Sequence, residues 1–233
     1  MAASSGKDTD YTTFSSESDG THEYESDGGA TARWFIENSN ADSLINEIAD
    51  DHDKRDAIYE WTCGTFMSGQ QYDGFSNMDW RDQARTRIYD NILDRARLDQ
   101  PIVVHRRATA ELLFGAGTRV ASEEEIKGMI GKTIVQVANM STGAAKEGLT
   151  IGSNKQIDYE IRIPKGKGWG MWIGDKRINP YFGDEQREFM TNRDIELKIV
   201  GYEKITGGTG SAHGKAMYKV ILQAVRQREH DYS

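Results

Sequence analysis

The hydrophobic pattern of the chain changes at about residue 100, and this change limits the fold more than any other feature. Over residues 34–99 the apolar side chains recur with a helical period, as in Leu44, Ile45 and Ile48, which follow the expected N-cap Asp42. Beyond that point, short β-branched and aromatic runs alternate with glycine-rich turns. A run of helices followed by a run of strands predicts an α+β fold.

We expect three or four helices in the lobe formed by residues 31–99, with a break in the polar segment 68–77. Residues 100–233 are expected to form the β part. Its predicted strands are 102–104, 133–137, 157–163, 170–173, 187–191, 195–202 and 216–225. Residues 31–233 are therefore interpreted as a single domain.

Residues 1–30 contain almost no aliphatic side chain, so they cannot bury enough apolar surface to offset the entropy of ordering. We predict an acidic disordered tail. It holds one lysine and seven acidic residues, whereas the whole chain has a formal charge of -8, so the remainder is close to neutral. The net charge therefore does not choose between a protein and a nucleic acid as partner.

Composition excludes several classes of protein. No apolar run approaches the ~20 residues of a membrane span, so no membrane partner is expected. A single cysteine, Cys63, excludes an internal disulfide and favours a reducing cytoplasm. The five histidines lack metal-ligand spacing, and we expect no metal. The glycine-rich segment 207–215 lacks the spacing of a phosphate loop and is expected to be a hairpin loop.

Two predicted strands end in polar side chains that can bind a ligand or orient a catalytic group. Arg106 and Arg107 follow the apolar run 101–105, and a guanidinium there can bind a phosphate or carboxylate. The alternative is an arginine at the sheet edge, exposed to water. Ser141 and Thr142 end another apolar run, where a hydroxyl can orient a carboxylate; the alternative is an ordinary turn.

A third strand begins with an amide and a carboxylate on the same side. Gln186 and Glu188 are two residues apart, so both project to one face of a strand. They follow the aromatic pair Tyr181 and Phe182. The alternative is a solvated charged turn.

The order of these elements, an arginine, then Ser-Thr, then Gln-x-Glu, resembles the bacterial exotoxin-like mono-ADP-ribosyltransferases over most of residues 45–205. Residues 56–62 look like the family's first amphipathic helix, and residues 161–174 resemble its strand-turn-strand before the catalytic loop. His105 takes a tyrosine place in the strand before the arginines. The resemblance implies a mixed, mainly antiparallel core of two sheets, and NAD as a substrate with no metal.

The resemblance also implies a role for each of these residues. Arg106 would bind a phosphate of NAD, with Arg107 as a second contact or, in the other register, the principal one. Ser141 would fix the rotamer of Glu188, and Thr142 would lie at the cofactor site. Glu188 would hold the 2′-hydroxyl of the nicotinamide ribose and stabilise its oxocarbenium character. Gln186, Tyr181 and Phe182 would face the acceptor.

Two departures from the family pattern bear on function. Gly143 stands where many members have a second serine, and Gln186 replaces the glutamate of members that modify arginine. The expected acceptor is therefore a non-arginine protein side chain or a nucleic-acid base. The chain would be a bacterial or phage toxin or effector that modifies it. An NAD glycohydrolase and a phage virion component with a vestigial domain remain alternatives. The resemblance leaves open an antitoxin or a phage particle as a further partner, and with it a virion-associated location.

Overall fold

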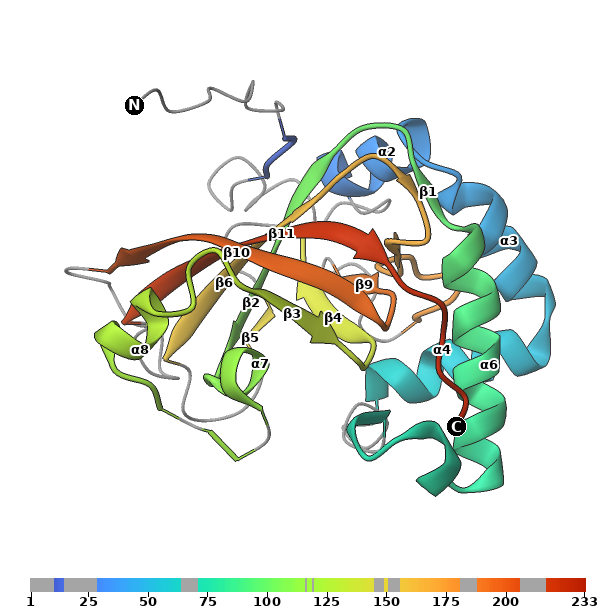
Figure 1. Cartoon of the computed structure of the whole chain (residues 1–233). Coiled ribbons are helices and arrows are strands. Elements are labelled where there is room, and N and C mark those ends of the chain that lie inside the picture. Colours follow the sequence, from blue (N-terminus) through green and yellow to red (C-terminus); the bar gives the residue numbers. More distant parts are fainter. Residues whose placement is uncertain are drawn as a thin grey trace.

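A computed structural model describes residues 11–14, 29–63, 71–115, 117–118, 120–144, 149–150, 156–180, 188–205 and 217–233. Its helices gather on one side of the sheet, apart from two short ones at the far end (Figure 1). They are α2 (Gly29–Glu37), α3 (Ala41–Asp50), α4 (His52–Cys63), the 3₁₀ helix η1 (Phe75–Asn77), α6 (Trp80–Arg95), α7 (Glu111–Phe114) and α8 (Glu123–Lys127).

Local chemistry explains where several helices begin. The Asp79 carboxylate caps α6 by accepting from the backbone N–H groups of Arg81 and Asp82. Asp42, expected as a cap, lies instead in the first turn of α3, because the helix begins one residue earlier, after Asn40. A carboxylate in the first turn still favours the helix through its dipole.

Each strand predicted from the sequence is present, and several short ones join them. The strands are β1 (Arg97–Leu98), β2 (Ile102–Ala108), β3 (Thr133–Gln136), β4 (Met140–Gly143), β5 (Leu149–Thr150), β6 (Ile157–Ile163), β7 (Gly166–Lys167), β8 (Gly170–Trp172), β9 (Glu188–Thr191), β10 (Ile195–Lys204) and β11 (Tyr218–Gln227). Residues 140–143, for which a turn was the alternative, form the strand β4.

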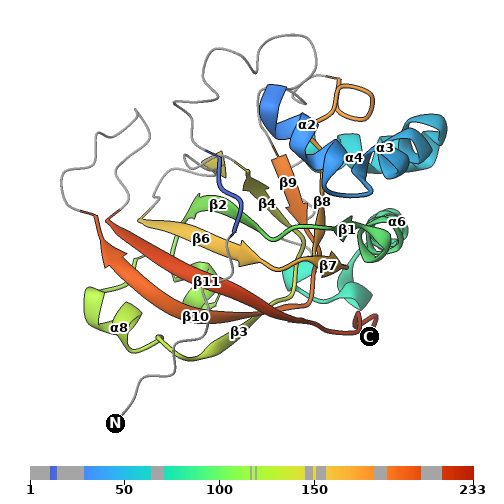
Figure 2. The same cartoon turned by 90° about the horizontal axis from the view of Figure 1, so that it is seen from above.

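The main sheet runs in the order β3-β10-β11-β6-β2-β4-β9-β8, with β5 beside β2, and β1 and β7 form a small second sheet. Pairings are mainly antiparallel; β11 with β6 and β2 with β5 are parallel. Strand β2 meets β4 at one register pair, His105 and Gly143. Figure 2 shows β4 and β9 crossing the direction of β6, β10 and β11, so the path divides into two halves at this contact.

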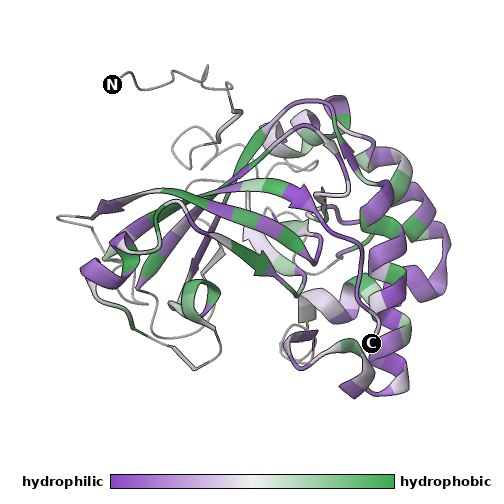
Figure 3. Ribbon diagram, viewed as in Figure 1, coloured by the Kyte–Doolittle hydropathy of each residue, from purple (hydrophilic) through white to green (hydrophobic). Residues whose placement is uncertain are grey.

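A single buried cluster joins the helices to both halves of the sheet. Phe35 of α2 stacks on Trp172 at 4.9 Å and on Phe189 at 5.7 Å between ring centroids. Hydrophobic and hydrophilic residues alternate along β10 and β11, as their period of two requires (Figure 3). Within the described residues, no helix has both the length and the apolar character needed to cross a membrane.

Part of the segment expected to be a disordered tail is ordered against the sheet. The Thr12 N–H donates to the Pro101 carbonyl at 3.0 Å, and the Val103 N–H donates to the Thr12 carbonyl at 2.9 Å. The Phe14 ring meets Trp34 edge-on. The expectation of disorder rested on the lack of aliphatic side chains in this segment. Backbone hydrogen bonds do not depend on side chains, so they can hold residues 11–14 against the sheet. The rest of residues 1–28 lies outside the described residues.

The C-terminal residues are fastened by a buried network of charges at the end of β9. Arg193, which is 4% exposed, donates through Nε and Nη2 to both carboxylate oxygens of Asp90 on α6. The His230 ring contacts Asp194 at 3.1 Å and Asp94 at 3.0 Å. Burial disfavours the charged imidazole, but the hydrogen bonds to Asp194 and Asp94 outweigh it and raise the pKa of His230 to about 9. The network therefore binds α6, the sheet and the chain end together.

The raised pKa of His230 predicts how stability depends on pH. Its stabilising contribution is complete below the ordinary pKa of 6.5 and is lost as the pH rises through about 9. We expect the free energy of unfolding to fall by roughly 1–3 kcal/mol over that interval, and His230→Gln to flatten the fall. Denaturant unfolding at a series of pH values measures it. His52→Gln, at a side chain 81% exposed, is the control, and an equal effect of both variants would contradict the assignment.

Gly170 allows β8 to lie against β9. A Cβ at this position would come within 2.7 Å of Phe189 Cε1 and 2.9 Å of Thr191 Cα, and its φ of +149° disfavours other residues. We expect Gly170→Ala to lower the free energy of unfolding by about 2 kcal/mol or more. Gly201→Ala in β10, where the nearest atom is 3.5 Å away, should lower the free energy of unfolding much less. Thermal unfolding of the two variants measures the difference. Similar losses in the two variants would refute the packing argument.

Candidate active site

Glu188 begins β9 and is 2% exposed. Its Oε1 accepts a hydrogen bond from Trp61 Nε1 at 3.3 Å, and the neighbouring Ser141 hydroxyl acts to lower the pKa of the carboxyl. These partners come from α4 and β4, which are far from β9 in the sequence. The fold thus brings the predicted carboxylate and the predicted serine together.

Ser141 is the central residue of this cluster. Its Oγ accepts from Trp61 Nε1 at 3.1 Å, and its backbone carbonyl accepts from Arg106 Nη1 at 2.7 Å. One indole N–H is therefore shared between the serine and Glu188. Trp61, Arg106, Ser141 and Glu188 form the candidate active site, and this group is called the catalytic cluster below for the role that is proposed for it.

Burial and hydrogen bonding act in opposite directions on Glu188. Burial raises the pKa of its carboxyl above the usual value, while the Ser141 and Trp61 hydrogen bonds and the charge of Arg106 oppose that rise. Burial also lowers the pKa of Arg106, and Tyr72, Glu188 and Tyr159 counteract this. An arginine nevertheless stays charged in a protein, so the site pairs a fixed cation with a carboxyl that can change its protonation state.

The two candidate arginines have different surroundings. Arg106 lies next to Ser141 and Glu188, whereas Arg107 is paired in register with Asp158 of β6. The Arg107 Nε is enclosed, and among the described residues it has no hydrogen-bond partner. The geometry thus places Arg106, rather than Arg107, in the catalytic cluster.

Thr142 faces away from the catalytic cluster. Neighbouring residues of a strand point to opposite faces, and the buried Thr142 hydroxyl donates to the Phe189 carbonyl at 2.6 Å. A contact with a cofactor would require this hydroxyl to give up that bond. Its position gives it a part in joining β4 to β9.

A buried pair of amides fixes the entrance to β4. Gln71 Nε2 donates to Asn139 Oδ1, and the Asn139 N–H donates to Gln71 Oε1, both at 2.7 Å. Next to this pair, Gln136 Nε2 donates to the hydroxyl of Tyr72 at 2.9 Å, and half of the Tyr72 side chain is exposed. Tyr72 also contributes to the electrostatic environment of Arg106. The segment before α6 therefore supports the strand that carries Ser141.

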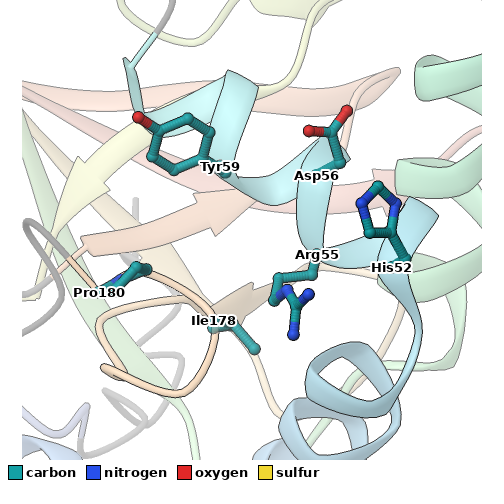
Figure 4. A pocket seen from close by; sticks show the side chains of 6 residues that line it. All are labelled: His52, Arg55, Asp56, Tyr59, Ile178 and Pro180. Atoms are coloured by element: carbon teal, nitrogen blue, oxygen red, sulfur yellow. The ribbon is translucent and has the colours of Figure 1, made fainter.

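A pocket of ≈ 200 Å³ lies beside α4, the helix that carries Trp61, but no residue of the catalytic cluster lines it. Figure 4 shows its lining: His52, Arg55, Asp56 and Tyr59 from α4, with Ile178 and Pro180 opposite. Pro180 directly precedes residues 181–187, which lie outside the described residues. The predicted acceptor residues Tyr181, Phe182 and Gln186 belong to that segment, so the structure does not place them.

Sequence reasoning missed the contact made by Trp61. The residue was interpreted as one of the periodic apolar positions of a helix, and its 7% exposure agrees with that. The available signal was chemical: a buried tryptophan N–H usually finds an acceptor. Its acceptors are 80 and 127 residues away in the chain, so local pattern could not identify them.

Solved structures resemble this architecture over most of the chain. Plx2a, an ADP-ribosyltransferase toxin from Paenibacillus larvae, matches with a TM-score of 0.66 at 16% identity, over 88% of this chain and 100% of that chain. The chain has the ADP-ribosyltransferase toxin fold. C3stau2 from S. aureus, in a structure with NAD, matches with a TM-score of 0.64 at 15% identity, over 94% and 99% of the two chains. The Clostridium limosum C3 exoenzyme gives 0.65 at 10% identity, over 93% and 98%.

These matches confirm the expected α+β fold. They also confirm, for the fold, the resemblance of the sequence to bacterial ADP-ribosyltransferases. No protein-family model matches the sequence, and no curated protein does. In the part of the chain that the structure describes, no group of three or more metal-ligating side chains is arranged to hold a metal ion.

The two neighbouring hydroxyls of β4 give a prediction that separates structure from chemistry. Thr142→Val removes an interior hydrogen bond and should lower the free energy of unfolding by about 1–2 kcal/mol. Ser141→Ala should cost less, because Trp61 keeps Glu188 as an acceptor. Denaturant unfolding of both variants measures this, and a larger loss in Ser141→Ala would contradict the assignment.

Proposed function

We propose that this chain is an NAD-dependent mono-ADP-ribosyltransferase that cleaves the bond between nicotinamide and ribose and transfers ADP-ribose to a macromolecular acceptor. The observation that carries the proposal is the catalytic cluster, in which Glu188, Ser141 and Arg106 meet on the ADP-ribosyltransferase fold. Two structural neighbours add support, since C3stau2 was solved with NAD and the toxin BECa of C. perfringens with NADH.

The groups of the cluster fit the chemistry of this reaction. Arg106, a half-buried cation, would bind a phosphate of NAD, and it is the principal arginine of the two because Arg107 follows it directly in β2 and points to the opposite face. Ionised Glu188 would accept a hydrogen bond from the 2′-hydroxyl of the nicotinamide ribose. As nicotinamide leaves with the bonding electron pair, positive charge develops on the ribose, and the nearby carboxylate stabilises it. The acceptor then forms its bond to the anomeric carbon and loses a proton.

The acceptor is the part of the proposal that rests on the sequence. Gln186 in place of a glutamate favours a non-arginine protein side chain or a nucleic-acid base, and Tyr181 and Phe182 would supply apolar anchors for it. A bacterial or phage toxin or effector acting in the cytoplasm is the setting that fits these features.

Glu188→Gln tests the site. The amide keeps the shape but removes the negative charge, so NAD cleavage should fall by roughly 10²–10³-fold while the protein remains folded. Release of nicotinamide from labelled NAD measures the rate, and Glu203→Gln, at a side chain 60% exposed on β10, is the matched control. An unchanged rate in Glu188→Gln would show that Glu188 does not take part in NAD cleavage.

The same assay separates the proposed activity from the alternatives. Labelled ADP-ribose attached to lysate protein or nucleic acid identifies a transferase, and treatment with protease or nuclease tells which acceptor carries it. Free ADP-ribose formed at the same rate with and without lysate would show a glycohydrolase. A chain that neither binds nor cleaves NAD would fit a virion component with a vestigial domain.

A further inference from the structure

We propose that Trp61 is a positioning residue, whose single indole N–H orients the Ser141 hydroxyl and holds the Glu188 carboxylate where it can stabilise the positive charge that develops on the ribose. The inference rests on the proposed function and adds a residue to the site that the Arg, Ser-Thr and Gln-x-Glu elements do not contain. It begins from two contacts of one hydrogen atom, to Ser141 Oγ at 3.1 Å and to Glu188 Oε1 at 3.3 Å.

The direction of these bonds follows from the chemistry of indole. Tryptophan Nε1–H is a donor and cannot accept, so Ser141 Oγ must be the acceptor in its contact with Trp61. The serine proton is then available for the neighbouring carboxylate, and Ser141 does act to lower the pKa of Glu188. Trp61 therefore sets the orientation of the serine, and through it the direction in which the serine proton can be donated.

The indole is itself held in place. Its side chain is 7% exposed, and the ring meets Tyr89 of α6 edge-on, with 5.7 Å between centroids. The Tyr89 hydroxyl in turn donates to the backbone carbonyl of Ala57 on α4. A ring fixed from two helices can impose a geometry on the side chains it contacts.

The indole also favours the ionised form of Glu188, because it can donate to a carboxylate but cannot accept from a carboxylic acid. Among the described residues, the other groups that act on this carboxylate are Ser141 from β4 and Arg106 from β2, both of which also favour ionisation. His105 lies in register with Gly143, which is itself paired with Glu188 one strand farther on. Tyr72 and Tyr159 act on Arg106 rather than directly on Glu188.

Trp61→Phe removes the N–H and keeps an aromatic ring. We expect kcat for NAD cleavage to fall about tenfold, the effect of losing one hydrogen bond to a charged group, with KM for NAD changed less than about twofold. Because a donor to the ionised form is lost, the acid limb of the kcat profile should move to higher pH. Trp80→Phe, at a side chain 72% exposed, is the matched control and should change neither.

A double-mutant cycle tests whether Trp61 acts through Ser141. If it does, the losses in Trp61→Phe and Ser141→Ala are not additive, and the double variant is little worse than the poorer single one. Additive losses together with an unmoved acid limb would reduce Trp61 to a packing residue and overturn the proposal.

An NMR titration tests the contact without any reference to activity and without needing Trp61→Phe to fold. The indole N–H resonance of Trp61 should shift as Glu188 titrates, and Glu188→Gln should abolish that shift. A resonance with the same pH dependence in both proteins would overturn the contact. A chain that shows the shift yet never cleaves NAD would refute the proposed function while leaving the contact standing.

Discussion

The buried carboxylate of Glu188 is the constraint on which the arrangement of the site depends. An ionised carboxylate removed from water is costly unless donors and a cation surround it. Here the donors come from α4 and β4 and the cation from β2, through Trp61, Ser141 and Arg106. Three elements that are distant in the sequence must therefore meet at one point, and the helical lobe cannot move away from the sheet without exposing or stranding that charge.

Strand β9 is fastened in the same manner at both ends. Glu188 begins it, and Arg193 follows its end, where both Asp90 oxygens on α6 accept from the guanidinium. Between these two points all four residues of the strand are buried, and Phe189 stacks on Phe35 of α2. Charge pairing thus fixes the ends of β9 and apolar packing fixes its middle. This division holds the Glu188 carboxylate on a rigid element, as the proposed preorganised site requires.

Local pattern predicted those parts of the fold that local chemistry determines. Residues 157–163 form β6 with the bounds read from the sequence, since their alternation and β-branched side chains specify a strand without knowledge of its neighbours. The capping box of Ser122 and Glu125 marks the start of α8, a helix that the hydrophobic pattern did not predict because it is only one turn long. Strand β4 and the Trp61 contact depend on partners far along the chain, and no period in the sequence reports such partners.

The described structure contains the groups for the first half of the proposed reaction, the cleavage of NAD, but not those for the second half, the choice of acceptor. The groups that would bind NAD and stabilise the breaking bond lie on β2, β4, β9 and α4, all within the described residues. The groups that would choose the acceptor lie in residues 181–187, between Pro180 at the pocket beside α4 and Glu188 in the catalytic cluster. A transferase and a glycohydrolase would share the first half and differ in the second. The catalytic cluster therefore argues for NAD cleavage in both cases, and only the identity of the attacking group, water or a macromolecule, distinguishes them.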